Sequence, residues 1–272
     1  MTPPLDPLIF TGGLSIFTCA IFGSLIGGMR QEGGKMRAKT FDLPELLISL
    51  VLGGAFAALV VKSALASAGP DAAKVTLDQV LPNSLFFVVM VVGITAFLAY
   101  RGIDIRVAMG LSRVPLVRAV ALGFGLILAA FPLVLCASLL TQMILRQDAQ
   151  EQELVTLFKQ AAQQSNRDGL AKIFFAGAVI APICEEFLFR GFFYVVFKRY
   201  LGAVGSALIT SALFAAFHAS LTVFPSLFVL ALLFTIAFES TGSLVVPMTM
   251  HALFNASQLG VLYLISRTPA VG

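Results

Sequence analysis

The sequence predicts an all-α integral membrane protein, a bundle of about eight transmembrane helices with interfacial amphipathic helices. Hydrophobic residues make up 58% of its 272 residues and charged residues only 12%, about half the charged fraction of an ordinary soluble domain. The apolar residues form long unbroken runs, whereas outer-membrane strands would alternate apolar and polar residues over segments of about ten. Composition and run length therefore favour a polytopic helical bundle.

Runs of about 20 mostly apolar residues are long enough to cross a bilayer as helices. In the first half of the chain such runs occupy 8–29, 44–68, 83–100 and 119–145. In the second half they occupy 170–197, 203–220, 224–239 and 243–265, of which 224–239 is the shortest. Because no long polar region separates them, we expect residues 1–272 to form a single polytopic membrane domain, with N-terminal helices in 1–145 and a second group in 170–265.

Two polar connections carry apolar residues at regular spacing. Within 146–169, Leu154, Phe158 and Ala161 fall at positions i, i+4 and i+7, a pattern typical of an amphipathic helix on a membrane surface. The loop 101–118 alternates arginine with apolar residues, and we expect it to lie in the interface as well.

The net charge of +4 does not indicate a nucleic-acid partner, because the basic residues gather in loops on one predicted side of the membrane. These residues are Arg30, Lys35, Arg37, Lys39, Arg101, Arg106, Arg113, Arg118, Lys198 and Arg199. The opposite side holds fewer, namely Lys74, Arg146, Lys159, Arg167, Lys172 and Arg267. The positive-inside rule then makes the first side cytoplasmic and predicts that both termini lie outside.

Ionisable residues inside the predicted spans gather in the second half of the chain. Glu185, Glu186 and Arg190 lie in one apolar run, although a charged group at the bilayer centre costs roughly 2.5–3.5 kcal/mol on insertion scales. Residues four apart are neighbours on a helix, so Glu186 and Arg190 can form an ion pair, which is often structural. Glu185, about 100° away around the axis, must find a partner on another helix or take up a proton.

The two histidines of the chain approach the depth of Glu185. From a turn at Tyr200–Leu201, Glu185 and His218 lie about 22 and 26 Å away at 1.5 Å per residue. His251 lies about 14 Å from a same-side turn at Thr241–Gly242, a difference that helix tilt can close. Asn255, four residues later, shares the face of His251. Each histidine alone is as easily a packing residue, but together these side chains predict a site.

Three motifs in this region resemble those of a known family. Residues 185–190 read EEFLFR, residues 214–218 read FAAFH and residues 251–255 read HALFN. In this order they are similar to the EExxxR, FxxxH and HxxxN motifs of the CAAX-protease and bacteriocin-processing (CPBP, or Abi) intramembrane endopeptidases, which include type II CAAX prenyl proteases. The resemblance covers about residues 170–260 and shows no departure at a motif position, which argues against a non-catalytic member.

The resemblance implies that residues 170–265 hold the catalytic helices and that a water hydrolyses a peptide bond within the membrane. Glu185 would be the general base, and His218 would help to hold the water. His251 and Asn255 would donate hydrogen bonds to the oxyanion. Glu186 and Arg190 would hold the helix and orient Glu185.

Two alternatives concern the cofactor. Glu185, His218 and His251 could supply three ligands to a catalytic zinc with an open fourth position. In that case Glu185 could not also be the base, and Glu186 would have to serve. Since the sequence has no HExxH motif, we favour a mechanism without a metal or other cofactor.

Other functions stay open at this stage. Buried glutamate and histidine also mark ion paths, so a transporter or proton relay is the main alternative, and a non-catalytic membrane scaffold is another. For a protease, the expected partners are the lipid bilayer and a membrane protein or lipidated peptide as substrate, of which prenylated CAAX tails are one class. The compact form predicts a multi-pass protein of a prokaryotic plasma (inner) membrane; the sequence leaves its oligomeric state open.

Overall fold

The computed structural model describes residues 5–32, 34–36, 40–66, 76–145 and 153–267. The regular secondary structure in these ranges is helical, without strands, which confirms the all-α prediction. The predicted loop cations Arg37, Lys39, Lys74 and Arg146, and the predicted end of the second span at 67–68, lie outside the described residues.

The helices of the first half follow the predicted runs, with α4 as a short addition in the loop 101–118. Their bounds are α1 Leu5–Glu32, α2 Leu43–Ala66, α3 Leu77–Tyr100, α4 Ile105–Ala108 and α5 Leu116–Leu145. The second half is a longer series of helical elements, two of them π-helices (η). These are α6 Glu153–Gln163, α7 Arg167–Phe175, η2 Ala176–Ile180, α8 Ala181–Glu186, η3 Phe187–Tyr194, α9 Val195–Phe217, α10 Phe224–Thr241 and α11 Val245–Arg267.

Six helices in the described part of the chain are long and apolar enough to cross a membrane, so the expected number of eight is not confirmed. One of the six, Arg167–Phe217, contains the predicted run 170–197 and most of the run 203–220. The two runs form one continuous series because they are joined at a single non-helical residue, Gly202, with φ 70° and ψ 176°. The seventh long helix, α11, carries His251, Asn255 and Gln258 in its apolar sequence.

Helix α3 begins six residues before the predicted run 83–100. Thr76 and Gln79 form a capping box at its start, in which each side chain bonds to the backbone of the other residue. The threonine and glutamine three positions apart are the sequence signal for this boundary. Hydropathy alone missed it because the first turn is polar.

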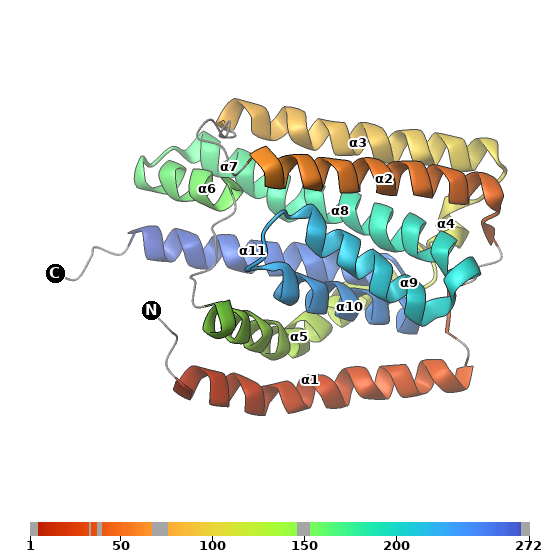
Figure 1. Cartoon of the computed structure of the whole chain (residues 1–272), viewed down its shortest axis with the longest axis horizontal. Coiled ribbons are helices and arrows are strands. Elements are labelled where there is room, and N and C mark those ends of the chain that lie inside the picture. Colours follow the sequence, from red (N-terminus) through yellow and green to blue (C-terminus); the bar gives the residue numbers. More distant parts are fainter. Residues whose placement is uncertain (1–4, 33, 37–39, 67–75, 146–152, 268–272) are drawn as a thin grey trace.

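The long helices run roughly along one axis of the molecule (Figure 1). Helix α1 begins and α11 ends at the same end of the bundle, whereas α4 and the bend in α9 lie at the other end (Figure 1). The loops predicted to be cytoplasmic therefore meet at one end. Which end faces the cytosol stays a prediction.

The most buried part of the chain is η3, where every residue from Phe187 to Tyr194 is buried. Apart from Arg190 its side chains are apolar or aromatic, which is typical of a helix in a protein core. It packs against α9 in a phenylalanine-rich cluster that also includes Ala231 and Phe238 of α10. The short helix α6 packs its predicted apolar face, including buried Phe158 and Ala161, against α7 and α11. That face is thus covered by protein.

Candidate active site

The helix that carries the adjacent glutamates, α8, lies between two π-helices. Pro182 lacks a backbone N–H, so it cannot donate the usual helical hydrogen bond to residue 178. Just before it, the N–H of Ala181 bonds to the carbonyl of Ala176 five residues earlier, which is the π-helical pattern. Such turns are rare and are frequent at functional sites. The predicted run 170–197 is therefore helical, and it includes π-helical segments on both sides of α8.

Glu186 and Arg190 form the predicted ion pair, with 2.9 Å between Arg190 Nη1 and Glu186 Oε1. Both side chains are buried. Arg190 also donates from Nη2 to the carbonyl of Ala231 at 3.0 Å, and its guanidinium lies 4.7 and 5.3 Å from the ring centres of Phe214 and Phe234. The cation is thus fixed on three sides.

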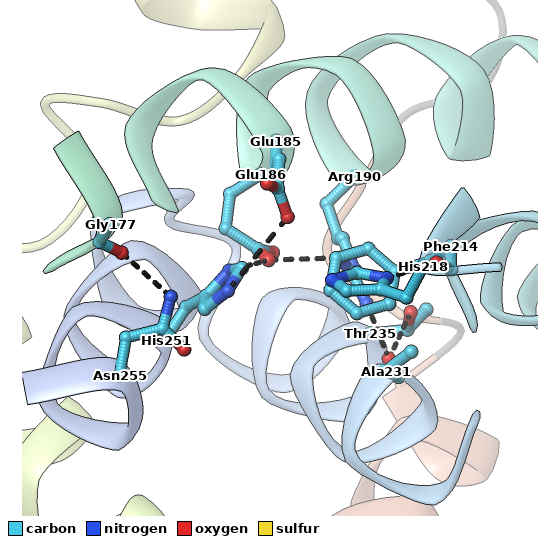
Figure 2. Close-up of polar contacts among 10 residues, drawn as sticks. All are labelled: Gly177, Glu185, Glu186, Arg190, Phe214, His218, Ala231, Thr235, His251 and Asn255. Carbon is cyan, nitrogen blue, oxygen red and sulfur yellow. Dashed lines mark hydrogen bonds and ion pairs between the residues drawn. The ribbon is translucent and has the colours of Figure 1, made fainter. Parts of the chain in front are cut away.

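His251 joins the same carboxylate from another helix. Its Nδ1 lies 2.9 Å from Glu186 Oε1, and its Nε2 lies 3.9 Å from Glu185 Oε2. Figure 2 shows both carboxylates pointing from one helix toward this imidazole. Because a carboxylate that is paired with arginine accepts hydrogen bonds, Nδ1–H is the donor and Nε2 faces Glu185. Glu186 thus contacts both Arg190 and His251, and its predicted role in orienting Glu185 stays a prediction.

His218 lies at the end of α9, next to the site. Its Nδ1 donates to the carbonyl of Phe214 at 2.8 Å, which leaves Nε2 as its other nitrogen. The Phe214 ring centre is 5.0 Å from that of His218 and 5.6 Å from that of His251. Both histidines therefore contact one phenylalanine, although no hydrogen bond joins His218 to Glu185 or His251 within the described residues.

Asn255 lies one turn beyond His251 on α11. It donates from Nδ2 to the carbonyl of Gly177, at 2.7 Å, in the first π-helix (Figure 2). An amide nitrogen carries two N–H groups, so one remains for another acceptor. The bond ties α11 to the segment that leads into Glu185 and Glu186.

Several polar atoms at this site are buried without a hydrogen-bond partner, namely Glu185 Oε2, Glu186 Oε2 and Arg190 Nε. Buried polar atoms are normally hydrogen-bonded to protein or to ordered water. Glu185 is the one of the two glutamates whose side chain is partly accessible, at 13%. The arrangement thus provides an acid group and an imidazole nitrogen 3.9 Å apart, with a carboxylate oxygen that has no hydrogen-bond partner among the described residues.

The donors do not fit the zinc alternative. Among the described residues, no group of three histidine, cysteine, aspartate or glutamate side chains lies close enough to hold a metal ion. Glu185 and His251 approach each other, whereas His218 uses Nδ1 for Phe214. We therefore derive no catalytic step through a metal.

Sequence reasoning did not foresee four supporting residues. Gly177 accepts from Asn255, Ala231 accepts from Arg190, and Phe214 and Phe234 contact both Arg190 and His251. Phe214 begins the FxxxH motif, which is a usable signal. Gly177 and Ala231 act through their backbone carbonyls, and Phe234 acts through packing. Residue type alone does not predict such roles.

The part of the chain that carries the three motifs is similar to known proteins. Residues 168–257 match a family model described as type II CAAX prenyl endopeptidase Rce1-like. An uncharacterised 24.3 kDa protein of Escherichia coli is 38% identical over 90 residues, which are 31% of this chain and 41% of that protein. No solved structure matches the chain. The family match covers all three motifs and confirms the resemblance: over residues 168–257 this chain is similar to the type II CAAX prenyl endopeptidases of the CPBP family, which supports an intramembrane protease of the CAAX type in general.

Proposed function

We propose that this chain is an intramembrane endopeptidase in which Glu185 activates a water to hydrolyse a peptide bond. One observation carries the proposal. Glu185 Oε2 is buried without a partner, and Nε2 of His251 faces it at 3.9 Å. Two polar groups at this separation are suited to share a water that lies beside the line joining them.

The reaction divides between two proton transfers. Glu185 takes a proton from the water as the oxygen attacks the scissile carbonyl, and it then gives this proton to the leaving amine. The carboxylate is thereby regenerated, so that no other reactant is consumed. His218, which contacts the same Phe214 ring as His251, would help to hold the water.

The oxyanion that forms on the carbonyl requires hydrogen-bond donors. Asn255 has one N–H beyond the one bound to Gly177, and His251 donates from Nε2 when both ring nitrogens are protonated. Each such donor is worth roughly 3–4 kcal/mol in a preorganised site. Glu186 and Arg190 act as positioning residues, since they hold the His251 ring by its Nδ1.

The substrate class follows from the location of the site. The EExxxR motif lies within the long apolar span Arg167–Phe217, so a substrate that reaches it would itself be in the membrane. We propose a membrane protein or a lipidated peptide, including prenylated CAAX tails. The bond that is cut would then lie close to the apolar part of that substrate.

Substitution of Glu185 tests the proposal. The full chain, in proteoliposomes, is incubated with a quenched library of prenylated peptides. Glu185→Gln keeps the size of the side chain and removes its basicity, so cleavage should fall at least about 100-fold with unchanged helix content and melting temperature. The matched control Asp168→Asn, at an exposed carboxylate, should retain cleavage. Full activity of Glu185→Gln would remove this residue from the mechanism.

A chelator tests the metal-free mechanism separately. Because the proposed steps use only side chains and water, cleavage should persist after treatment with a zinc chelator. A loss of cleavage that zinc specifically restores would contradict the mechanism while leaving the protease assignment intact. Proton uptake by the proteoliposomes without peptide cleavage would favour the proton relay instead.

A further inference from the structure

A second polar site is lined in part by α4, which lies at one end of the bundle (Figure 1). It is a pocket of about 360 Å³ in which the loop between α1 and α2 meets α4 and the loop after it. Its three charged lining residues are all basic: Lys35, Arg106 and Arg113. A volume in this range is typical of small-molecule sites.

The backbone of this pocket is attached firmly to the core. Arg113 Nη1 donates to the carbonyl of Lys35 at 2.7 Å, which joins the two loops across the pocket. Met36, which lines the pocket, and Met109, between the lining residues Ala108 and Gly110, are buried in the main core cluster. Gly110 has φ 61° and approaches the carbonyl of Gly242 so closely that a Cβ would overlap it. The walls are thus held independently of any ligand.

The cations of the pocket, Lys35, Arg106 and Arg113, have no ion-pair partner in the described part of the chain. A neighbouring pocket of about 300 Å³ shares Lys35 and Arg113 and adds Arg118. Several like charges held together without a counter-ion attract an anion.

The rim of the pocket indicates where this anion comes from. Val107, which lines the pocket, is 75% exposed, and Leu116 and Val117 just beyond it are 67% and 83% exposed. Apolar side chains beside clustered cations are typical of a segment that lies at the level of lipid headgroups. A soluble anion would need the cations alone.

We propose that this pocket binds the phosphate group of an anionic phospholipid headgroup, with Lys35 and Arg106 as ligands and the exposed apolar residues against the acyl chains. Arg113 supports the site through its bond to Lys35. The shared chemistry is a phosphate ester, whose other source would be a soluble phosphate. This inference does not depend on the protease activity.

The test measures lipid binding to the full chain. The protein is purified in a neutral detergent and titrated with short-chain phosphatidylglycerol, and the bound fraction is read by native mass spectrometry. Separate titrations with phosphatidylcholine and with glycerol phosphate distinguish charge from lipid. We expect saturable binding of phosphatidylglycerol, weak binding of phosphatidylcholine, and glycerol phosphate binding that is weaker by tenfold or more.

The variants locate the binding. Removing one cation near a lipid surface should weaken binding about fivefold, so Lys35→Gln with Arg106→Gln should weaken it about 25-fold. The matched control Arg30→Gln removes an exposed charge from α1, outside the pocket lining, and should change binding less than twofold. Equal losses in Arg30→Gln and Arg106→Gln would reduce the effect to diffuse surface charge and overturn the proposal, as would native binding by the double variant. Tight binding of glycerol phosphate that depends on Arg106 would keep the phosphate site and reject the lipid as its ligand.

Discussion

At the scale of residues, one oxygen of Glu186 holds two partners. Glu186 Oε1 lies 2.9 Å from Arg190 Nη1 and 2.9 Å from His251 Nδ1. Burying an ion pair costs desolvation that can equal its Coulomb energy, so such a pair is weak evidence for added stability. Its consequence here is geometric, because it fixes which nitrogen of His251 faces Glu185.

Removing one partner of this pair should nevertheless be costly. Arg190→Met leaves the Glu186 carboxylate buried beside a single imidazole, and we expect the free energy of unfolding to fall by about 3–5 kcal/mol. Unfolding by a denaturing detergent, followed by circular dichroism, measures this change. The exposed Arg167→Met should stay within about 0.5 kcal/mol of the native protein. If the two variants were equally stable, burial of Glu186 would not require the charge of Arg190.

At the scale of elements, Gly202 determines how two helices are joined. Its φ of 70° and ψ of 176° belong to a region that is essentially restricted to glycine. The chain therefore turns back at one residue, and the length from Glu185 to the bend and from the bend to His218 sets their depths. With a longer loop at this point, the depths of Glu185 and His218 would no longer follow from their distances along the sequence.

Replacement of this glycine tests the bend. No atom lies within 4 Å of a Cβ at Gly202, so Gly202→Ala should act through the backbone alone and destabilise the protein by about 1–3 kcal/mol. Gly125→Ala in α5, also without a neighbour within 4 Å, should be neutral or stabilising by about 0.5–1 kcal/mol. Thermal unfolding of the two variants in the same detergent compares them. A harmless Gly202→Ala would mean that the bend tolerates another conformation.

At the scale of the whole molecule, the two ends of the bundle differ in charge and in content. Helix α1 begins and helix α11 ends at one end of the bundle, and α4 lies at the opposite end (Figure 1). The pocket with Lys35, Arg106 and Arg113 is lined in part by α4. The positive-inside rule predicts that the basic end faces the cytosol. A substrate would then reach the helices that carry the three motifs either from within the bilayer or from one of these two ends.

Labelling of single cysteines tests this orientation. Ser112 and Gln164 are exposed in connections near opposite ends of the chain's long helices. In a background without Cys19, Cys136 and Cys184, a membrane-impermeant maleimide should label Gln164→Cys in intact cells and Ser112→Cys only after the cells are opened. The reverse pattern would place both termini in the cytosol.

The sequence predicted the helical runs well because each long run is uniformly apolar, and it predicted the Glu186–Arg190 pair because that pair is local to one helix. It expected Glu185 and His251 to approach each other, and they lie 3.9 Å apart. The π-turn at Pro182 and the start of α3 at Thr76 were missed, although Pro182 and the Thr76–Gln79 spacing carry the signals. The predicted roles of the site residues and the absence of a metal stay predictions.

What the sequence by itself determined was the class of the protein and the polar side chains that are candidates for its site, because hydrophobic run length and residue type are properties of the chain alone. Only the tertiary structure decided that Glu186 holds His251, that Asn255 is bound to Gly177, and that a basic pocket forms between two distant loops. These contacts join residues on different helices, and their geometry depends on bends and helix register that local sequence does not encode.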